Sequence, residues 1–186
     1  MRKIAIIGAG QAGLHLGIGL IDAGYAVTLF SDRTPEAIRY GSPMGTPVLF
    51  SDTLQLERNL GLNFWDDEFS NGLRFRSQVC DPEGNTALVL SSDVRQHWQA
   101  IDQRLKFFAW MQEFVKRGGE LVIQATIPED LEAYAQAYDL VVVTAGRGAF
   151  STLFERDDQK SNHDTPKRYI VSFITTGLKG DREDLL

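Results

Sequence analysis

The sequence predicts an α/β fold in which helices cover a parallel, Rossmann-like sheet. Near the N-terminus an aliphatic run, Ile4–Ile7, leads through three glycines into an apolar helical stretch, Leu14–Ala23. A second aliphatic run, Tyr25–Phe30, completes a β-α-β unit within the first 31 residues. Helical and strand-like stretches then alternate up to a last aliphatic run, Asp139–Thr144. Because a buried parallel strand has a continuous rather than an alternating apolar pattern, these runs fit one parallel sheet.

The glycines after the first strand form the motif Gly-x-Gly-x-x-Gly, which is typical of dinucleotide-binding proteins. We expect Gly8 to turn the chain out of the strand, Gly10 to let a pyrophosphate approach the backbone, and Gly13 to allow close packing of the helix. Backbone N–H groups at the positive end of the helix would hold the pyrophosphate. The candidate cofactor-binding residues of this loop are Gly8, Ala9, Gly10, Gln11, Ala12 and Gly13. The alternative, that the glycines serve helix packing alone, stays open.

The middle of the chain predicts loops, one short helix and a β-hairpin inserted into the α/β order. Ser31–Pro35 is expected to form a loop, and residues 39–50, rich in Gly and Pro, to be irregular. Asp52 is expected to cap a helix over Thr53–Leu60. Two alternating runs between residues 73 and 92 predict the hairpin.

The second half of the chain returns to the α/β pattern. A helix over residues 102–117 would present an apolar face made of Leu105, Phe108, Met111 and Val115. The remaining expected elements are a strand at 120–124, a helix at 128–138, a fully buried strand at 139–144 and a tail strand at 169–175.

A second group of candidate ligands, Ser31, Asp32 and Arg33, follows the second strand. Dinucleotide-binding folds place an acid for the adenosine ribose about 20 residues after the glycines, which is where this group lies. The Asp32 carboxylate can accept hydrogen bonds from ribose hydroxyls, whereas the Arg33 guanidinium suits the 2′-phosphate of NADP. A solvated turn without a ligand is the third interpretation.

Two further candidates lie later in the chain. Arg104 opens a helix, where a cation opposes the helix dipole. It therefore indicates either a bound anion or an ion pair with an acid such as Asp102, and the residues alone favour the ion pair.

The last group of candidates ends a strand at the edge where ligands of open α/β sheets lie, and consists of Thr144, Ala145 and Gly146. An ordinary strand-to-loop turn is the alternative for these three.

The composition of the chain excludes several classes of protein and of binding site. The 186 residues carry a net charge of -6, which argues against a nucleic-acid partner, and no apolar stretch is long enough to cross a membrane. The single cysteine, Cys80, excludes an internal disulfide and a cysteine-based zinc site, and fits a reducing cytoplasm. The three histidines have no metal-binding spacing. With no paired nucleophile and base, the catalytic residues stay unknown, and a cofactor is expected to supply the chemistry.

Taken together, these motifs resemble the FAD-dependent aromatic monooxygenases, and among them the oxygenase subunit of styrene and indole monooxygenases. The matching stretches occur in the same order and at similar spacing over nearly the whole chain. They are Ile4–Gly17, Val27–Pro35, Ile101–Leu105 with Arg117–Gly119, Tyr138–Arg147, Phe154–Glu155 and Pro166–Arg168.

This resemblance implies FAD as the cofactor, with its pyrophosphate on the Gly8–Gly13 loop and its ribose at Ser31 or Asp32. It implies that Arg104 helps to hold the FAD phosphates and that Thr144–Gly146 forms a second flavin-contacting turn. The implied partner is an NADH-dependent flavin reductase, from which reduced FAD diffuses to the oxygenase. With O2 the reduced flavin would form a hydroperoxide that oxygenates an apolar aromatic alkene resembling styrene or indole. A homodimer is one assembly considered for such a protein.

The resemblance also divides the chain. Residues 1–150 would form the FAD-binding domain, with a β-rich excursion at about 73–92, and 151–186 the truncated start of a substrate-binding domain. The later Gly-Asp flavin motif of the family has no counterpart, and Ser42–Gly45 lacks an Arg and an Asn that the family carries. Two alternatives stay open: a module that binds FAD or its ADP half without turnover, and an NAD(P)-binding, reductase-like domain.

Overall fold

The computed structural model describes residues 1–45, 48–66, 72–146, 148–165 and 171, with side chains undescribed at 72–76 and 93–97. The chain divides into two compact units. The first unit combines Met1–Met44 with Asp102–Ser172, and the second contains Gly45–Ile101.

The first unit is built on a parallel sheet in the order β6-β2-β1-β7. Its strands are β1 (Lys3–Ile7), β2 (Ala26–Ser31), β6 (Glu120–Ile123) and β7 (Leu140–Val143). The central strands β1 and β2 are buried over nearly their whole lengths. This confirms the predicted parallel α/β sheet. β7, expected to be fully buried, is instead an edge strand of the described sheet, and its Leu140 is 52% exposed.

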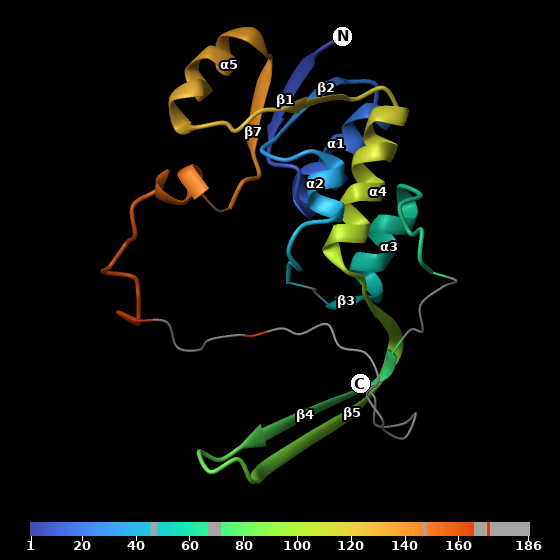
Figure 1. The fold of residues 1–186 in the computed structure, drawn as a ribbon, viewed down its shortest axis with the longest axis vertical. Coiled ribbons are helices and arrows are strands. Elements are labelled where there is room, and N and C mark those ends of the chain that lie inside the picture. The colour runs from blue at the N-terminus through green and yellow to red at the C-terminus, as the bar shows by residue number, and fades with distance from the viewer. Residues whose placement is uncertain (46–47, 67–71, 147, 166–170, 172–186) are drawn as a thin grey trace. The chain divides into compact units, whose positions relative to one another are not determined.

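Helices cover both faces of this sheet (Figure 1). On one face lie α1 (Gln11–Asp22) and α4 (Gln103–Lys116), which meet where Gly17 lies against the Phe114 ring. A Cβ at Gly17 would lie 2.9 Å from that ring, so the two helices approach closely. On the other face α5 (Leu131–Ala137) packs on a cluster formed by Ala5, Ile7 and Phe30. The helix predicted over residues 128–138 begins with a 3₁₀ turn, Pro128–Asp130, which precedes α5.

The apolar face predicted for α4 was wrong. The fully buried aromatic and sulfur side chains are Trp110, Met111 and Phe114, whereas Val115 is 50% exposed. The predicted apolar face and the face that is buried in the structure both have helical spacing and share Met111, so periodicity alone could not distinguish them. The structure buries the stripe that contains the larger rings, because these remove more apolar surface from water.

A short helix that was not predicted, α2 (Pro35–Arg39), lies between the expected loop, Ser31–Pro35, and the expected irregular segment, 39–50, and overlaps each by one residue. Thr34 caps it, accepting a hydrogen bond from the Ala37 N–H at 3.1 Å, and Pro35 is its first residue. Both features are ordinary signals of a helix start. The five residues show no apolar periodicity beside them.

In its described residues, the second unit contains an antiparallel sheet in the order β3-β5-β4 and the helix α3. Its elements are β3 (Val48–Phe50), α3 (Ser51–Asn59), β4 (Gly72–Cys80) and β5 (Thr86–Ala100). The predicted hairpin is confirmed as β4–β5, although β5 extends well beyond residue 92 and pairs with the unpredicted β3. Asp52 is not the cap expected of it: α3 begins at Ser51, and Asp52 lies in its first turn.

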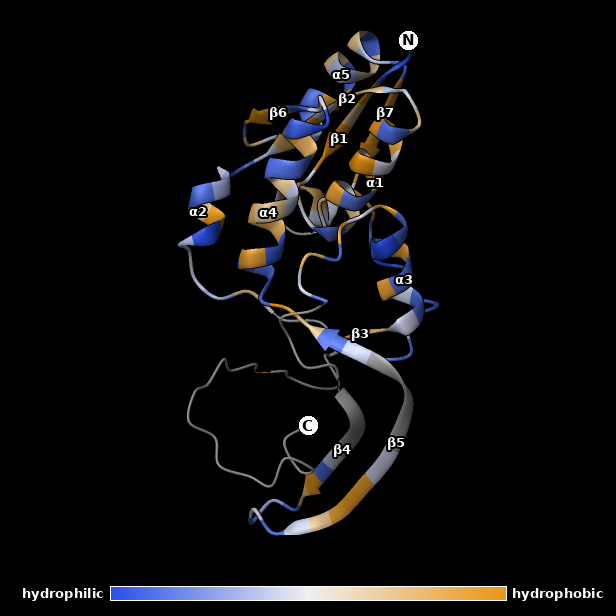
Figure 2. Cartoon of the chain, turned by 90° about the vertical axis from the view of Figure 1, so that its right-hand side faces the viewer, coloured by the Kyte–Doolittle hydropathy of each residue, from blue (hydrophilic) through white to orange (hydrophobic). Residues whose placement is uncertain are grey.

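Hydrophobic residues are concentrated along β1 and β7 and also toward the tip of the hairpin (Figure 2). In the hairpin, Val79, Leu88 and Leu90 are each about half exposed. No helix in the described ranges is long and apolar enough to cross a membrane. The predicted tail strand at 169–175 lies, except for Val171, outside the described residues.

Candidate functional site

The loop between β1 and α1 is the centre of the candidate site. Gly8 has a φ of 111°, a conformation that L side chains rarely adopt, so this turn requires glycine. Its N–H donates to the Phe30 carbonyl at 2.9 Å, which extends the β1–β2 pairing into the turn. α1 then begins at once, with Gly10 as its N-cap.

Gly13 and Thr144 fix this loop against the end of β7. A Cβ at Gly13 would lie 2.0 Å from the Gly8 carbonyl oxygen and 2.7 Å from Thr144 Oγ1. The Thr144 hydroxyl lies 2.8 Å from the Gly8 carbonyl and 3.0 Å from the Ile7 carbonyl, and donates to both. Gly8, Gly13 and Thr144 therefore form one closely packed corner, in which both glycines are explained by the chain's own packing.

Gly10 differs from the other two glycines. Its φ of -82° and ψ of -174° suit any residue, and a Cβ there would meet no protein atom within 4 Å. Neither the backbone nor packing therefore requires a glycine at this position. The first turn of α1 also has no acidic residue and no side-chain cap, so the positive helix end is not compensated there. Both features fit a pyrophosphate group lying against Gly10 at the helix N-terminus.

The end of β2 lies beside this loop and carries the predicted ribose ligands. Ser31 is only 2% exposed, and its hydroxyl donates to the Arg33 carbonyl at 2.7 Å within its own turn. The Asp32 side chain, in contrast, is 68% exposed, and its carboxylate lies 3.5 Å from the Arg33 guanidinium, which is a long contact. Of the two predicted ribose ligands, Asp32 is the one whose oxygens are accessible.

Arg104 makes the ion pair with Asp102 that was one of its two interpretations. Its guanidinium donates to the Asp102 carboxylate at 2.6 Å and 3.0 Å and to the Gly41 carbonyl at 3.3 Å. Asp102 also caps α4, accepting the Arg104 N–H at 2.9 Å. The hydrogen bonds from Arg104 hold the pKa of Asp102 below its ordinary value. The predicted contact of Arg104 with FAD phosphates stays a prediction.

Ala145 and Gly146 follow Thr144 at the carboxyl end of β7. The Ala145 backbone closely approaches Gly8, since a Cβ on Gly8 would lie 2.9 Å from the Ala145 nitrogen. Gly146, like Gly10, would meet no protein atom within 4 Å if it carried a Cβ. The structure thus brings Thr144–Gly146 beside the Gly8–Gly13 loop, as their strand ends predict.

One segment beside these strand ends was missed from the sequence. The loop after β6, Gln124–Ile127, begins where the Gln124 N–H donates to the Ser31 carbonyl at 2.7 Å. Its proximity to Ser31 depends on β6 pairing with β2, and no local motif in the sequence indicates that pairing. The aliphatic run at 120–124 was the only signal available.

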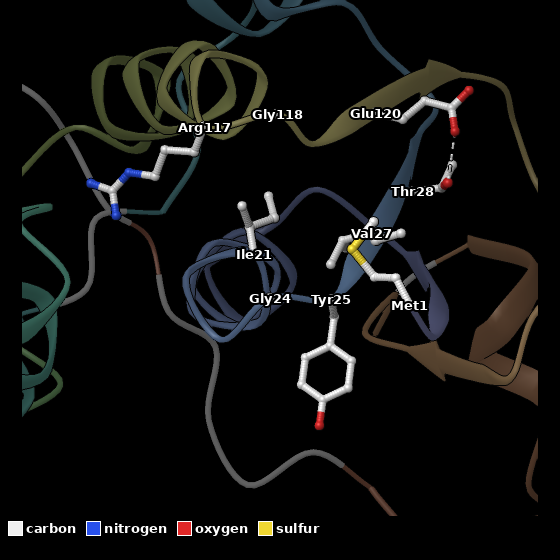
Figure 3. Close-up of a pocket in the computed structure, with 10 residues that line it drawn as sticks. Met1, Ile21, Gly24, Tyr25, Val27, Thr28, Arg117, Gly118 and Glu120 are labelled. Atoms are coloured by element: carbon white, nitrogen blue, oxygen red, sulfur yellow. Dashed lines mark hydrogen bonds between the residues drawn. The ribbon is translucent and has the colours of Figure 1, made fainter.

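A pocket of about 450 Å³ lies at the opposite, amino-terminal end of the sheet (Figure 3). It is bordered by the end of α1, the start of β2 and the end of α4. Its polar groups are already paired: the Thr28 hydroxyl donates to Glu120 at 2.8 Å, and Arg117 binds Asp22 and Glu113. Ligands of open α/β sheets lie beyond the carboxyl ends of the strands, so this pocket is not the candidate cofactor site.

Several solved structures share this architecture. FqzB matches with a TM-score of 0.53 at 15% identity, covering 65% of this chain and 28% of that one. The 2-methyl-3-hydroxypyridine-5-carboxylic acid oxygenase matches with a TM-score of 0.51 at 16% identity, covering 66% and 31%. CtdE, solved with FAD and a substrate, matches with a TM-score of 0.50 at 14% identity, covering 65% and 29%. These matches confirm the predicted Rossmann-like FAD-binding fold.

Two curated sequence relatives are styrene monooxygenases. The chain is 31% identical to styrene monooxygenase StyA of Pseudomonas sp and 30% identical to StyA of Pseudomonas fluorescens, in each case over 178 residues. These matches cover 96% of the chain and 42% of each relative, so the chain spans less than half the length of the proteins it matches. The predicted resemblance to the N-terminal portion of the styrene monooxygenases is confirmed. No protein-family model matches the chain.

Proposed function

We propose that this chain binds FAD as part of the oxygenase component of a two-component flavin monooxygenase. The observation that carries the proposal is the contrast among the three glycines. Gly8 and Gly13 are required by the turn and by packing, whereas Gly10 is required by neither. A glycine that the protein itself does not need, at an uncapped helix N-terminus, is accounted for by a phosphate-bearing ligand.

The chain's own residues then have distinct tasks. Backbone N–H groups at the start of α1 would bind the FAD pyrophosphate, and the exposed Asp32 carboxylate would accept hydrogen bonds from the adenosine ribose. Thr144 would keep the Gly8 turn in place through its two carbonyl contacts. Arg104 would approach the FAD phosphates while Asp102 holds its guanidinium. FAD, when bound and reduced, supplies the oxygen-activating chemistry.

The proposed partner and substrate follow from the relationship to StyA. A separate NADH-dependent flavin reductase would deliver reduced FAD, and the acceptor of the oxygen atom from O2 would be an apolar aromatic alkene or heteroaromatic compound.

The experiment is to titrate the purified chain with FAD, and then to add a flavin reductase, NADH and either indole or styrene. Saturable FAD binding together with an oxygenated product, such as indigo from indole, supports the whole proposal. FAD binding without product restricts the chain to a binding role. Tight NADPH binding with no affinity for FAD would refute the proposal and favour the reductase-like alternative.

A further inference from the structure

Lys106, near the start of α4, is a buried cation that the proposed function does not use. Its side chain is almost completely enclosed, with an exposed fraction of 3%. The ammonium nitrogen lies over the ring of the fully buried Trp110, 5.1 Å from the ring centroid. Burying an ammonium costs free energy even where it has partners, and an apolar side chain in its place is often as stable. A lysine at this position therefore points to a task other than stability.

Helices α1 and α4 pack side by side and run in the same direction, so contacts between them show which residues lie at the same level. Three contacts set this register: His15 with Trp110, Gly17 with Phe114, and Asp22 with Arg117. In each pair the α4 residue comes 95–97 positions later in the chain. One turn before His15 and Trp110, Gln11 at the start of α1 is therefore level with Lys106.

The Lys106 ammonium consequently lies near the end of α1 that carries the glycine loop. Because it extends over the Trp110 ring, its level falls between Gln11 and His15, about one helical turn of 5.4 Å from the start of α1. The Trp110 ring lies on the side of α4 that faces α1, since its centroid is 6.2 Å from that of His15. Packed helices are about 8–10 Å apart, which places the ammonium roughly 10 Å from a pyrophosphate at this helix end.

We propose that Lys106 is a positioning residue for the diphosphate of the bound dinucleotide, attracting it through a buried charge that does not touch it. This inference rests on the proposed function, from which it takes the pyrophosphate at Gly10. The charge adds to the positive end of α1, whose first turn contains no acidic residue. A buried charge is screened little by water and salt, so its attraction reaches further than that of a surface lysine.

The test compares Lys106→Met, which removes the charge and keeps an unbranched side chain, with Lys106→Arg, which keeps the charge. ADP and adenosine are the probes, because only ADP carries the diphosphate. For unit charges about 10 Å apart at an effective dielectric constant of about 20, the lost attraction lowers affinity about ten-fold. We therefore expect Lys106→Met to bind ADP about ten-fold more weakly by calorimetry and to bind adenosine like the wild type in an NMR titration. Lys106→Arg should restore ADP affinity.

Lys116→Met is the matched control. It removes a lysine from the same helix, but the Lys116 side chain lies at the other end, is 76% exposed and pairs with Glu113 at 2.9 Å. Its loss should change ADP affinity by less than about two-fold. The near-ultraviolet circular dichroism of the tryptophans checks that each variant is folded, and Lys106→Gln, a second uncharged variant, replaces Lys106→Met if that protein does not fold.

The outcomes separate charge from shape. An unchanged ADP affinity in the folded, uncharged variant would overturn the proposal, as would an equal loss for ADP and adenosine, which indicates a distorted site. A Lys106→Arg protein as weak as Lys106→Met would assign the effect to the shape of the side chain and also overturn it. Equal losses in Lys116→Met would assign it to net charge, with the same consequence. If the wild-type chain binds neither ADP nor FAD, the proposed function itself fails, which is a separate result.

Discussion

Replacing Gly13 by alanine is the most demanding test of how the glycine corner is packed. The added Cβ would lie 2.0 Å from the Gly8 carbonyl oxygen and 2.7 Å from Thr144 Oγ1, so α1 must move away from the β1 turn. Overpacking of this kind costs about 3 kcal/mol, and the better helix propensity of alanine returns about 1 kcal/mol. The expected net loss of roughly 2 kcal/mol corresponds to a melting temperature lower by about 4–8 °C, measurable by calorimetry or circular dichroism.

Gly10→Ala is the matched comparison. Its backbone conformation suits alanine, and the new Cβ meets no protein atom within 4 Å, so stability should change by less than about 1 kcal/mol. We expect this variant to keep the wild-type melting temperature and to lose affinity for ADP. A Gly13→Ala protein that melts with the wild type, or a Gly10→Ala protein that melts as low as Gly13→Ala, would refute the assignment of packing to Gly13 and ligand approach to Gly10.

Two further predictions concern the residues around this corner. Thr144→Val removes the hydroxyl that binds the Ile7 and Gly8 carbonyls. We expect the free energy of unfolding, measured with urea, to fall by about 1 kcal/mol and ADP to bind more weakly. An unchanged free energy of unfolding together with unchanged ADP affinity would contradict the role given to Thr144. In the folded protein the pKa of Asp102 is lowered, chiefly by the hydrogen bond from Arg104. The stability that the Asp102 carboxylate contributes is therefore fully present above its unfolded pKa of about 3.9. This contribution is lost as the pH falls through the lower pKa of the folded protein. Asp102→Asn should therefore flatten the acid side of the stability profile measured by urea unfolding between about pH 2 and 6, and a profile as steep as that of the wild type would exclude this ion pair as a cause.

The parts of the fold set by local sequence were predictable. The run Ile4–Ile7, the glycine motif and Tyr25–Phe30 define a β-α-β unit by themselves, since each element follows from residues close in sequence. The hairpin was found for the same reason, because its two alternating runs are adjacent. What local patterns could not give was the choice between two helical stripes on α4, which depended on the packing of Phe114 against Gly17.

The candidate site was predictable in its composition and less so in its contacts. Strand ends place Gly8, Asp32 and Thr144 at one edge of a parallel sheet, which follows from topology alone. The loop Gln124–Ile127 was missed because β6 joins the sheet beside β2 through a pairing between residues about ninety positions apart, Thr28 and Glu120 among them. Long-range pairing of this kind leaves no local signal.

The measurement that tests the central claim most directly is an FAD binding isotherm for the wild-type chain and for Gly10→Val, with ADP as competitor. We expect the wild type to bind FAD saturably, ADP to displace it, and Gly10→Val to keep its fold while losing both ligands. A wild-type chain with no affinity for FAD, or a Gly10→Val chain that binds FAD as tightly as the wild type, would contradict the claim that this loop holds the cofactor.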